Sequence, residues 1–159
     1  MNDTGFHSAL LVLTGSTVAV GALWDVLRYR IPNAVTFGAM GAGLLYHAGL
    51  GPDAQGLLFG LEGLIPLLAI GFALFARGLL GAGDAKLLGA VGALLGPKLG
   101  LTAFIYAALC GGVWALIWVL PGSYKELAVL GLRAVEGRRL PYGPAIAAGT
   151  GLSLVLPLW

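Results

Sequence analysis

Long apolar runs separated by short polar stretches form the dominant pattern of this chain. A helix needs about 20 apolar residues to cross the hydrocarbon core of a bilayer, so each run is a candidate membrane helix. The six runs are residues 8–24, 34–50, 56–76, 85–96, 99–120 and 144–158. The pattern therefore predicts an all-α, polytopic membrane protein with six transmembrane helices, formed by residues 1–159 as one domain.

The fourth run is short for a membrane helix. Its roughly 12 residues would rise only about 18 Å, so it would thin the bilayer, borrow flanking residues or stop partway. The charges in the loops favour a full crossing, because six crossings place eight basic residues on one side and only Lys98 on the other. The eight are Arg28, Arg30, Arg77, Lys86, Lys125, Arg133, Arg138 and Arg139. The positive-inside rule then predicts a cytoplasmic location for that side and outside locations for both termini.

Composition supports the membrane interpretation. The chain is 58% hydrophobic and 10% charged, whereas soluble domains carry about 25% charged residues. The lipid bilayer is therefore the expected partner, and the net charge of +2 without a dense basic run predicts no nucleic-acid partner. The single cysteine, Cys110, excludes an intramolecular disulfide and a cysteine zinc cluster, and we expect it to be a packing residue. The first run is expected to be a retained helix rather than a cleaved signal peptide.

Two aspartates stand out in this apolar chain. Asp25 ends the first run, and Asp84 opens the fourth within Gly81-Ala82-Gly83-Asp84-Ala85-Lys86. A carboxylate at a membrane segment is costly and suggests a function, and the six-helix topology puts both acids at the cytoplasmic face. Two carboxyls within reach of each other can share one proton, so that one activates a water molecule and the other protonates a peptide carbonyl. Gly81 and Gly83 would give an extended peptide access to Asp84.

Each acid alone also has a structural interpretation. Asp84 could cap the N-terminus of its helix, and Asp25 could pair with Arg28 or Arg30. Glu62 lies inside the third run, where an acid can be functional, but we expect a protonated carboxyl that hydrogen-bonds a neighbouring helix. Residues 124–139 have moderate amphipathic periodicity, which indicates a helix in the cytoplasmic interface or a solvated loop.

Three motifs occur in order along the chain. They are Asp25 followed by Ile31-Pro32-Asn33, then Gly81-Ala82-Gly83-Asp84-Ala85-Lys86-Leu87-Leu88, then Leu140-Pro141-Tyr142-Gly143-Pro144-Ala145. Together they resemble the aspartic prepilin peptidases, the type IV prepilin leader peptidases of the GxGD class of intramembrane aspartyl proteases. The resemblance implies a GxGD fold, catalytic roles for Asp25 and Asp84, and no metal or cofactor. It implies supporting roles for Gly81, Gly83, Lys86, Pro141, Tyr142 and Gly143.

The resemblance also implies a substrate. This would be a prepilin or pseudopilin with a short basic leader and an apolar helix, cleaved at the cytoplasmic face. Many bacterial members carry an N-terminal region with paired CxxC motifs and also methylate the new N-terminus. With one cysteine, this chain resembles the short, peptidase-only form, and we expect no methyltransferase activity.

Two other functions remain open from the residues themselves. A transporter or channel component could use the aspartates to bind protons or cations, and a non-catalytic scaffold could use them as caps. Transporters place such acids near the bilayer midplane between broken helices, whereas Asp25 and Asp84 lie at the ends of runs. The identity of the substrate, the oligomeric state and the distance between the two carboxyls do not follow from the sequence.

Overall fold

A computed structural model describes residues 4–50, 56–119 and 142–158. Its elements are α1 (Thr4–Arg28), α2 (Asn33–Leu45), the π-helical turn η1 (Tyr46–Leu50), α3 (Leu57–Ala76), α4 (Ala82–Val119) and α6 (Gly143–Val155). The described ranges contain no strand, which confirms the all-α prediction. The predicted interfacial segment 124–139 lies outside the described residues.

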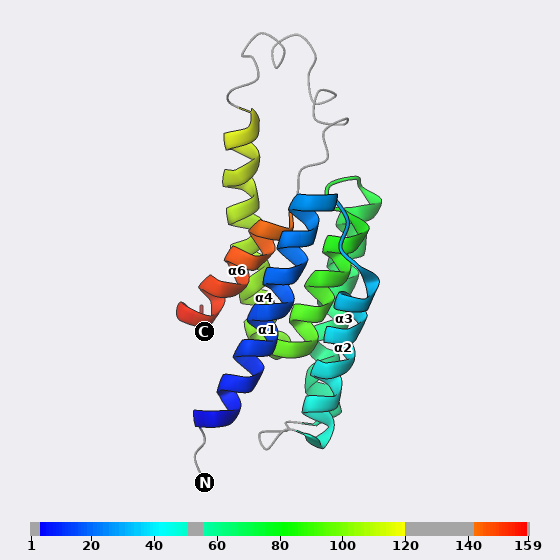
Figure 1. The fold of residues 1–159 in the computed structure, drawn as a ribbon, viewed down its shortest axis with the longest axis vertical. Helices are drawn as coiled ribbons and strands as arrows, with labels where there is room; N and C mark the ends of the chain where they lie inside the picture. The colour runs from blue at the N-terminus through cyan, green and yellow to red at the C-terminus, as the bar shows by residue number, and fades with distance from the viewer. Residues whose placement is uncertain (1–3, 51–55, 120–141, 159) are drawn as a thin grey trace.

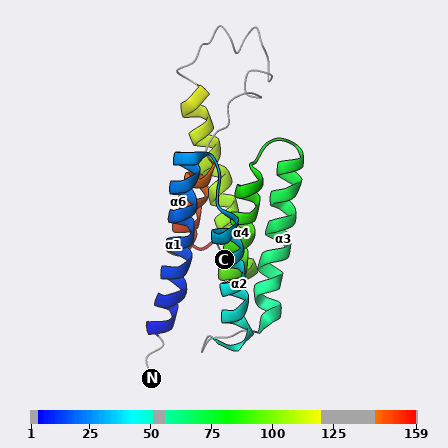
Figure 2. The same cartoon turned by 45° about the vertical axis from the view of Figure 1, so that its right-hand side comes forward.

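The helices run up and down beside one another, and α4 itself reverses direction (Figures 1 and 2). The reversal is at Gly96, whose φ of 74° and ψ of −173° are not helical, and the next residue is a proline. A Cβ added to Gly100 would lie only 3.2 Å from the Cα of Gly92, so the chain doubles back tightly. We call residues 82–95 the first arm of α4 and residues 97–119 its second arm.

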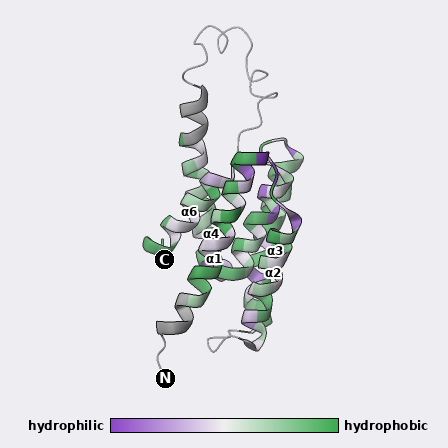
Figure 3. Ribbon diagram, in the orientation of Figure 1, coloured by the Kyte–Doolittle hydropathy of each residue, from purple (hydrophilic) through white to green (hydrophobic). Residues whose placement is uncertain are grey.

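Three helices in the described ranges are long and apolar enough to cross a membrane: residues 9–28, 57–76 and 82–113. The last of these includes the reversal at Gly96, so it is not one straight span. Apolar residues cover most of the bundle, and the most hydrophilic positions gather near the end where α1 terminates (Figure 3). These features support a membrane protein, whereas six crossings remain a prediction.

Helix is present at each of the six predicted segments, but several boundaries differ by a few residues from the prediction, and two of the differences concern the first two helices. The first helix continues past Trp24 to Arg28, so Asp25 lies in its last turn and not in the following loop. It ends where Tyr29 adopts a φ of 51°, a left-handed conformation that stops a helix. The second segment is α2 only as far as Leu45, and η1 completes it.

The short fourth segment is explained by its surroundings. The first arm of α4 packs against α1, α2 and α3, and its side chains Ala85, Leu87, Ala90, Ala93 and Leu94 are fully buried. A helix enclosed by other helices does not have to match the thickness of the bilayer. The buried arm therefore has no need of the full length that a lipid-facing helix requires.

Glycines allow the helices that carry this arm to approach closely. A Cβ added to Gly63 on α3 would overlap the backbone of Gly92 on the first arm, and one on Gly149 of α6 would overlap Ala107 on the second arm. Small residues permit such backbone contact between membrane helices. Gly92 therefore lies in a helix interface, whereas Gly96 forms the reversal.

Candidate active site

Asp25 is held where the end of α1 meets the start of α6. Its side chain is 6% exposed, and its Oδ2 accepts a hydrogen bond of 2.8 Å from the backbone N–H of Gly143. A Cβ added to Gly143 would lie 2.9 Å from the Cβ of Asp25 and 3.0 Å from the Cα of Ala22. Position 143 therefore needs glycine for the two helices to bring this N–H to the carboxyl.

Asp84 lies in the first turn of α4. The backbone N–H of Ala85 donates to the carbonyl of Gly81 at 3.0 Å, so Gly81 is the N-cap residue. The predicted capping role of Asp84 is therefore corrected: Asp84 is three residues further on, and its Oδ2 accepts the Gly81 N–H at 3.2 Å. Glutamate and glutamine often reach back to the N-cap in the same way. Asp84 is 6% exposed, and its buried Oδ1 has no hydrogen-bond partner within the described ranges.

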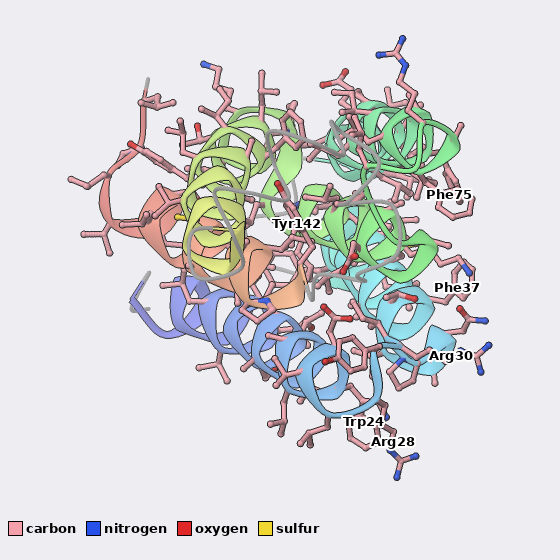
Figure 4. The ribbon with its side chains drawn as sticks, turned by 90° about the horizontal axis from the view of Figure 1, so that it is seen from above. Trp24, Arg28, Arg30, Phe37, Phe75 and Tyr142 are labelled. Atoms are coloured by element: carbon pink, nitrogen blue, oxygen red, sulfur yellow. The ribbon has the colours of Figure 1, made fainter. Side chains whose placement is uncertain are left out.

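The two acids meet at one end of the bundle. The C-terminal end of α1 and the N-terminal ends of α4 and α6 all lie at this end (Figure 1), and the Asp25 and Asp84 carboxyls interact electrostatically. The guanidinium of Arg28 lies 5.6 Å from the Trp24 ring centroid, and Arg28 and Arg30 point outward from the bundle (Figure 4). The structure therefore does not show the alternative ion pair between Asp25 and Arg28 or Arg30.

Tyr142 brings a third polar group to the same region. It is half-buried, and a Cβ added to Gly111 on the second arm of α4 would overlap its hydroxyl. Burial and the nearby charge of Asp84 raise the pKa of the Tyr142 phenol. Figure 4 shows Tyr142 near the centre of the bundle, whereas Trp24 is at its edge. Gly111 was not predicted as a site residue, and its only signal is its position in the Gly111-Gly112 pair of an apolar run.

The two glycines before Asp84 have different neighbours. A Cβ added to Gly81 would lie 2.7 Å from Asp84 Oδ2, so glycine leaves room for the carboxyl. A Cβ added to Gly83 would lie 3.2 Å from the Cβ of Ile31, so Gly83 packs against the segment that leads into α2. Ile31 itself is buried. Both glycines thus fix the start of α4 relative to its surroundings.

Lys86, the other predicted supporting residue on α4, points to α2. Its Nζ donates to Asn33 Oδ1 at 2.9 Å and lies 5.2 Å from the Phe37 ring centroid. Asn33 was quoted in the sequence motif but had no predicted role. Pro141, the last of the predicted supporting residues, lies outside the described residues.

The remaining predicted acid is separate from this site. Glu62 is exposed on α3. Its carboxyl makes no hydrogen bond to any residue that the structure describes, so the predicted bond to a neighbouring helix is not observed. Within the described ranges, no group of three or more histidine, cysteine, aspartate or glutamate side chains could hold a metal ion.

The fold and site define a class: a helical membrane protein with two buried carboxyls brought together at one end of its bundle. Residues 12–116 match the type IV leader peptidase family, and the chain belongs to this family. The chain is 34% identical over 108 residues to a prepilin leader peptidase/N-methyltransferase of Bacillus subtilis (strain 168). That match covers 68% of this chain and 36% of the relative. No solved structure matches the chain.

The family match confirms the resemblance seen in the motifs. Its residues include both Asp25 and Asp84, whereas Tyr142 and Gly143 lie beyond it. The absence of N-methyltransferase activity from this chain remains a prediction, because the relative's name carries both activities and only about a third of its length is matched.

Proposed function

We propose that this chain is an aspartic endopeptidase that cleaves the leader peptide of type IV prepilins or pseudopilins. The observation that carries the proposal is the convergence of Asp25 and Asp84, two buried acids from separate helices, at one end of the bundle. Membership of the type IV leader peptidase family supports the substrate class.

The proposed chemistry needs only the two carboxyls and water. One carboxylate takes a proton from water while the other, protonated, donates to the scissile carbonyl. Oδ1 of Asp84 is buried and has no hydrogen-bond partner among the described residues, so a peptide carbonyl that reaches it would supply the missing partner. Gly81 is exposed and places no side chain beside Asp84, which suits the approach of an extended segment.

We further propose that the site faces the cytoplasm and that the chain crosses the inner membrane six times, with both termini outside. Arg28 ends α1, which carries Asp25 in its last turn, and Arg30 follows it. Arg77 caps α3 just before the start of α4, which carries Asp84. Basic residues favour the cytoplasmic side. The apolar helix of a pilin precursor would lie in the bilayer beside the bundle, with its basic leader in the cytoplasm.

The test is cleavage by the Asp25→Asn and Asp84→Asn variants. Each substitution keeps the shape of the side chain but removes its acid–base function, so each should lower cleavage by about a thousandfold or more. The measurement is the mobility shift of a coexpressed prepilin on a gel, with membrane insertion checked by fractionation. Glu62→Gln, which removes an exposed acid outside the site, is the matched control and should cleave normally. Full cleavage by either aspartate variant would refute the proposal.

A further inference from the structure

The two acids of the site are not equivalent in their hydrogen bonding. Oδ2 of Asp25 accepts the short, buried bond from Gly143, and the backbone N–H of Tyr142 also interacts with this carboxyl. Gly143 is the first residue of α6, so the positive end of that helix dipole faces the carboxyl. Helix N-termini stabilise anions through both their free N–H groups and their dipole. Burial of the Asp25 carboxyl opposes its ionisation, and these donors, which Asp84 lacks to the same degree, offset part of that cost.

Asp84 has fewer donors. Its Oδ2 accepts the longer bond from Gly81, and its buried Oδ1 faces no donor among the described residues. A charged oxygen that is buried without a donor is costly, whereas a protonated oxygen can donate to an incoming carbonyl. This environment favours the protonated form of Asp84.

We infer that Asp25 is the general base and Asp84 the general acid, and that Gly143 is the positioning residue that sets this division. The inference rests on the proposed peptidase function. The other charged groups nearby do not alter the assignment. Arg28 lies over Trp24 and Lys86 bonds Asn33. The Tyr142 phenol is uncharged at neutral pH, as phenols ordinarily are, and burial raises its pKa further.

With these roles, each proton that an aspartate takes up or gives away is returned by the end of the reaction. Asp25 takes a proton from water, the hydroxide adds to the scissile carbonyl carbon, and Asp84 gives its proton to the carbonyl oxygen. In the second step, protonated Asp25 gives its proton to the leaving nitrogen while Asp84 takes one from a hydroxyl of the diol. The C–N bond breaks, and both acids return to their starting states.

The inference is tested by the pH profile of kcat/KM for a synthetic prepilin-like peptide, measured with the full chain in nanodiscs. Gly143→Ala should move the acidic limb to higher pH by about one unit, because the bond to the Asp25 carboxylate is disturbed. At pH values below this limb, kcat should therefore fall about tenfold with KM little changed. Gly151→Ala is the matched control on α6, since an added Cβ there meets open space.

A second variant keeps the test decisive if Gly143→Ala does not fold. Gly81 is exposed, and Gly81→Ala crowds Oδ2 of Asp84, so it should move the basic limb and leave the acidic limb in place. A shift of the basic limb in Gly143→Ala, or of the acidic limb in Gly81→Ala, would overturn the assignment. So would an unchanged pH profile in both variants when they are folded, since glycine would then serve packing alone. Cleavage by Asp25→Asn or Asp84→Asn would instead overturn the peptidase function itself.

Discussion

At the scale of single residues, the contacts of Lys86 indicate a structural role and not a catalytic one. Both of its contacts, Asn33 and Phe37, belong to α2, and the Lys86 side chain is only partly buried. Lys86→Met keeps the aliphatic stem on the ring and removes the hydrogen bond. We expect cleavage within about threefold of wild type and a free energy of unfolding lowered by less than about 1 kcal/mol, because exposed charged contacts contribute little.

This expectation is checked by peptide cleavage and by thermal unfolding in detergent. Asn33→Ala removes the same bond from the other side and should give the same small change in both measurements. A loss of cleavage above a hundredfold in folded Lys86→Met, without a similar loss in Asn33→Ala, would assign Lys86 to the chemistry.

At the scale of helices, the approach of α3 to the first arm of α4 depends on Gly63. An added Cβ there meets the backbone carbonyl of Gly92, which cannot turn aside as a side chain can. Gly63→Ala should therefore lower the free energy of unfolding by about 1–3 kcal/mol. Gly41→Ala on α2 is the control, because a Cβ there meets nothing within 4 Å. Equal unfolding temperatures for the two variants would contradict this close packing.

The reversal of α4 has its own stabilising contact. The helix break at Gly96 deprives the last carbonyls of the first arm of donors from a next turn, and His47 Nε2 lies 3.0 Å from the carbonyl of Leu94. His47→Phe should cost about 1–3 kcal/mol, since it leaves a buried carbonyl without this donor. His47→Gln, which retains an N–H group, should recover part of the loss. Chemical denaturation of both variants measures the difference, and an unaltered midpoint for His47→Phe would refute the role.

Apolar periodicity predicted which segments are helical, but it could not locate the ends that shape the site. Polarity changes at Asp25 because the chain leaves the apolar region there, while the α-helical backbone continues to Arg28. Asp84 was expected at the N-cap because aspartate is common there, yet Gly81 occupies that position. The Gly143 donor lies 118 residues from Asp25, so only the family resemblance pointed to it.

At the scale of the whole molecule, alternation of helix direction brings the acids together. α1 ends, and α4 and α6 begin, at the same end of the bundle (Figure 1). This placement requires the reversal at Gly96, because the first arm must descend and the second must return before α6 can start there. Loop charge alone predicted that both acids share a face, and the arrangement of the helices agrees with that grouping.

The orientation of the bundle in the membrane gives the last prediction. Lys98 is exposed just after the reversal, at the end of the bundle opposite the acids, whereas Arg77 is exposed beside the start of α4. In a Cys110→Ala background, Lys98→Cys should react with a membrane-impermeant maleimide in intact bacterial cells, and Arg77→Cys should react only after lysis, because basic residues favour the cytoplasmic side. Retained cleavage by both variants is the control for folding. Labelling of Arg77→Cys in intact cells, with protection of Lys98→Cys, would place the acids on the outer face and exclude cytoplasmic processing of a leader.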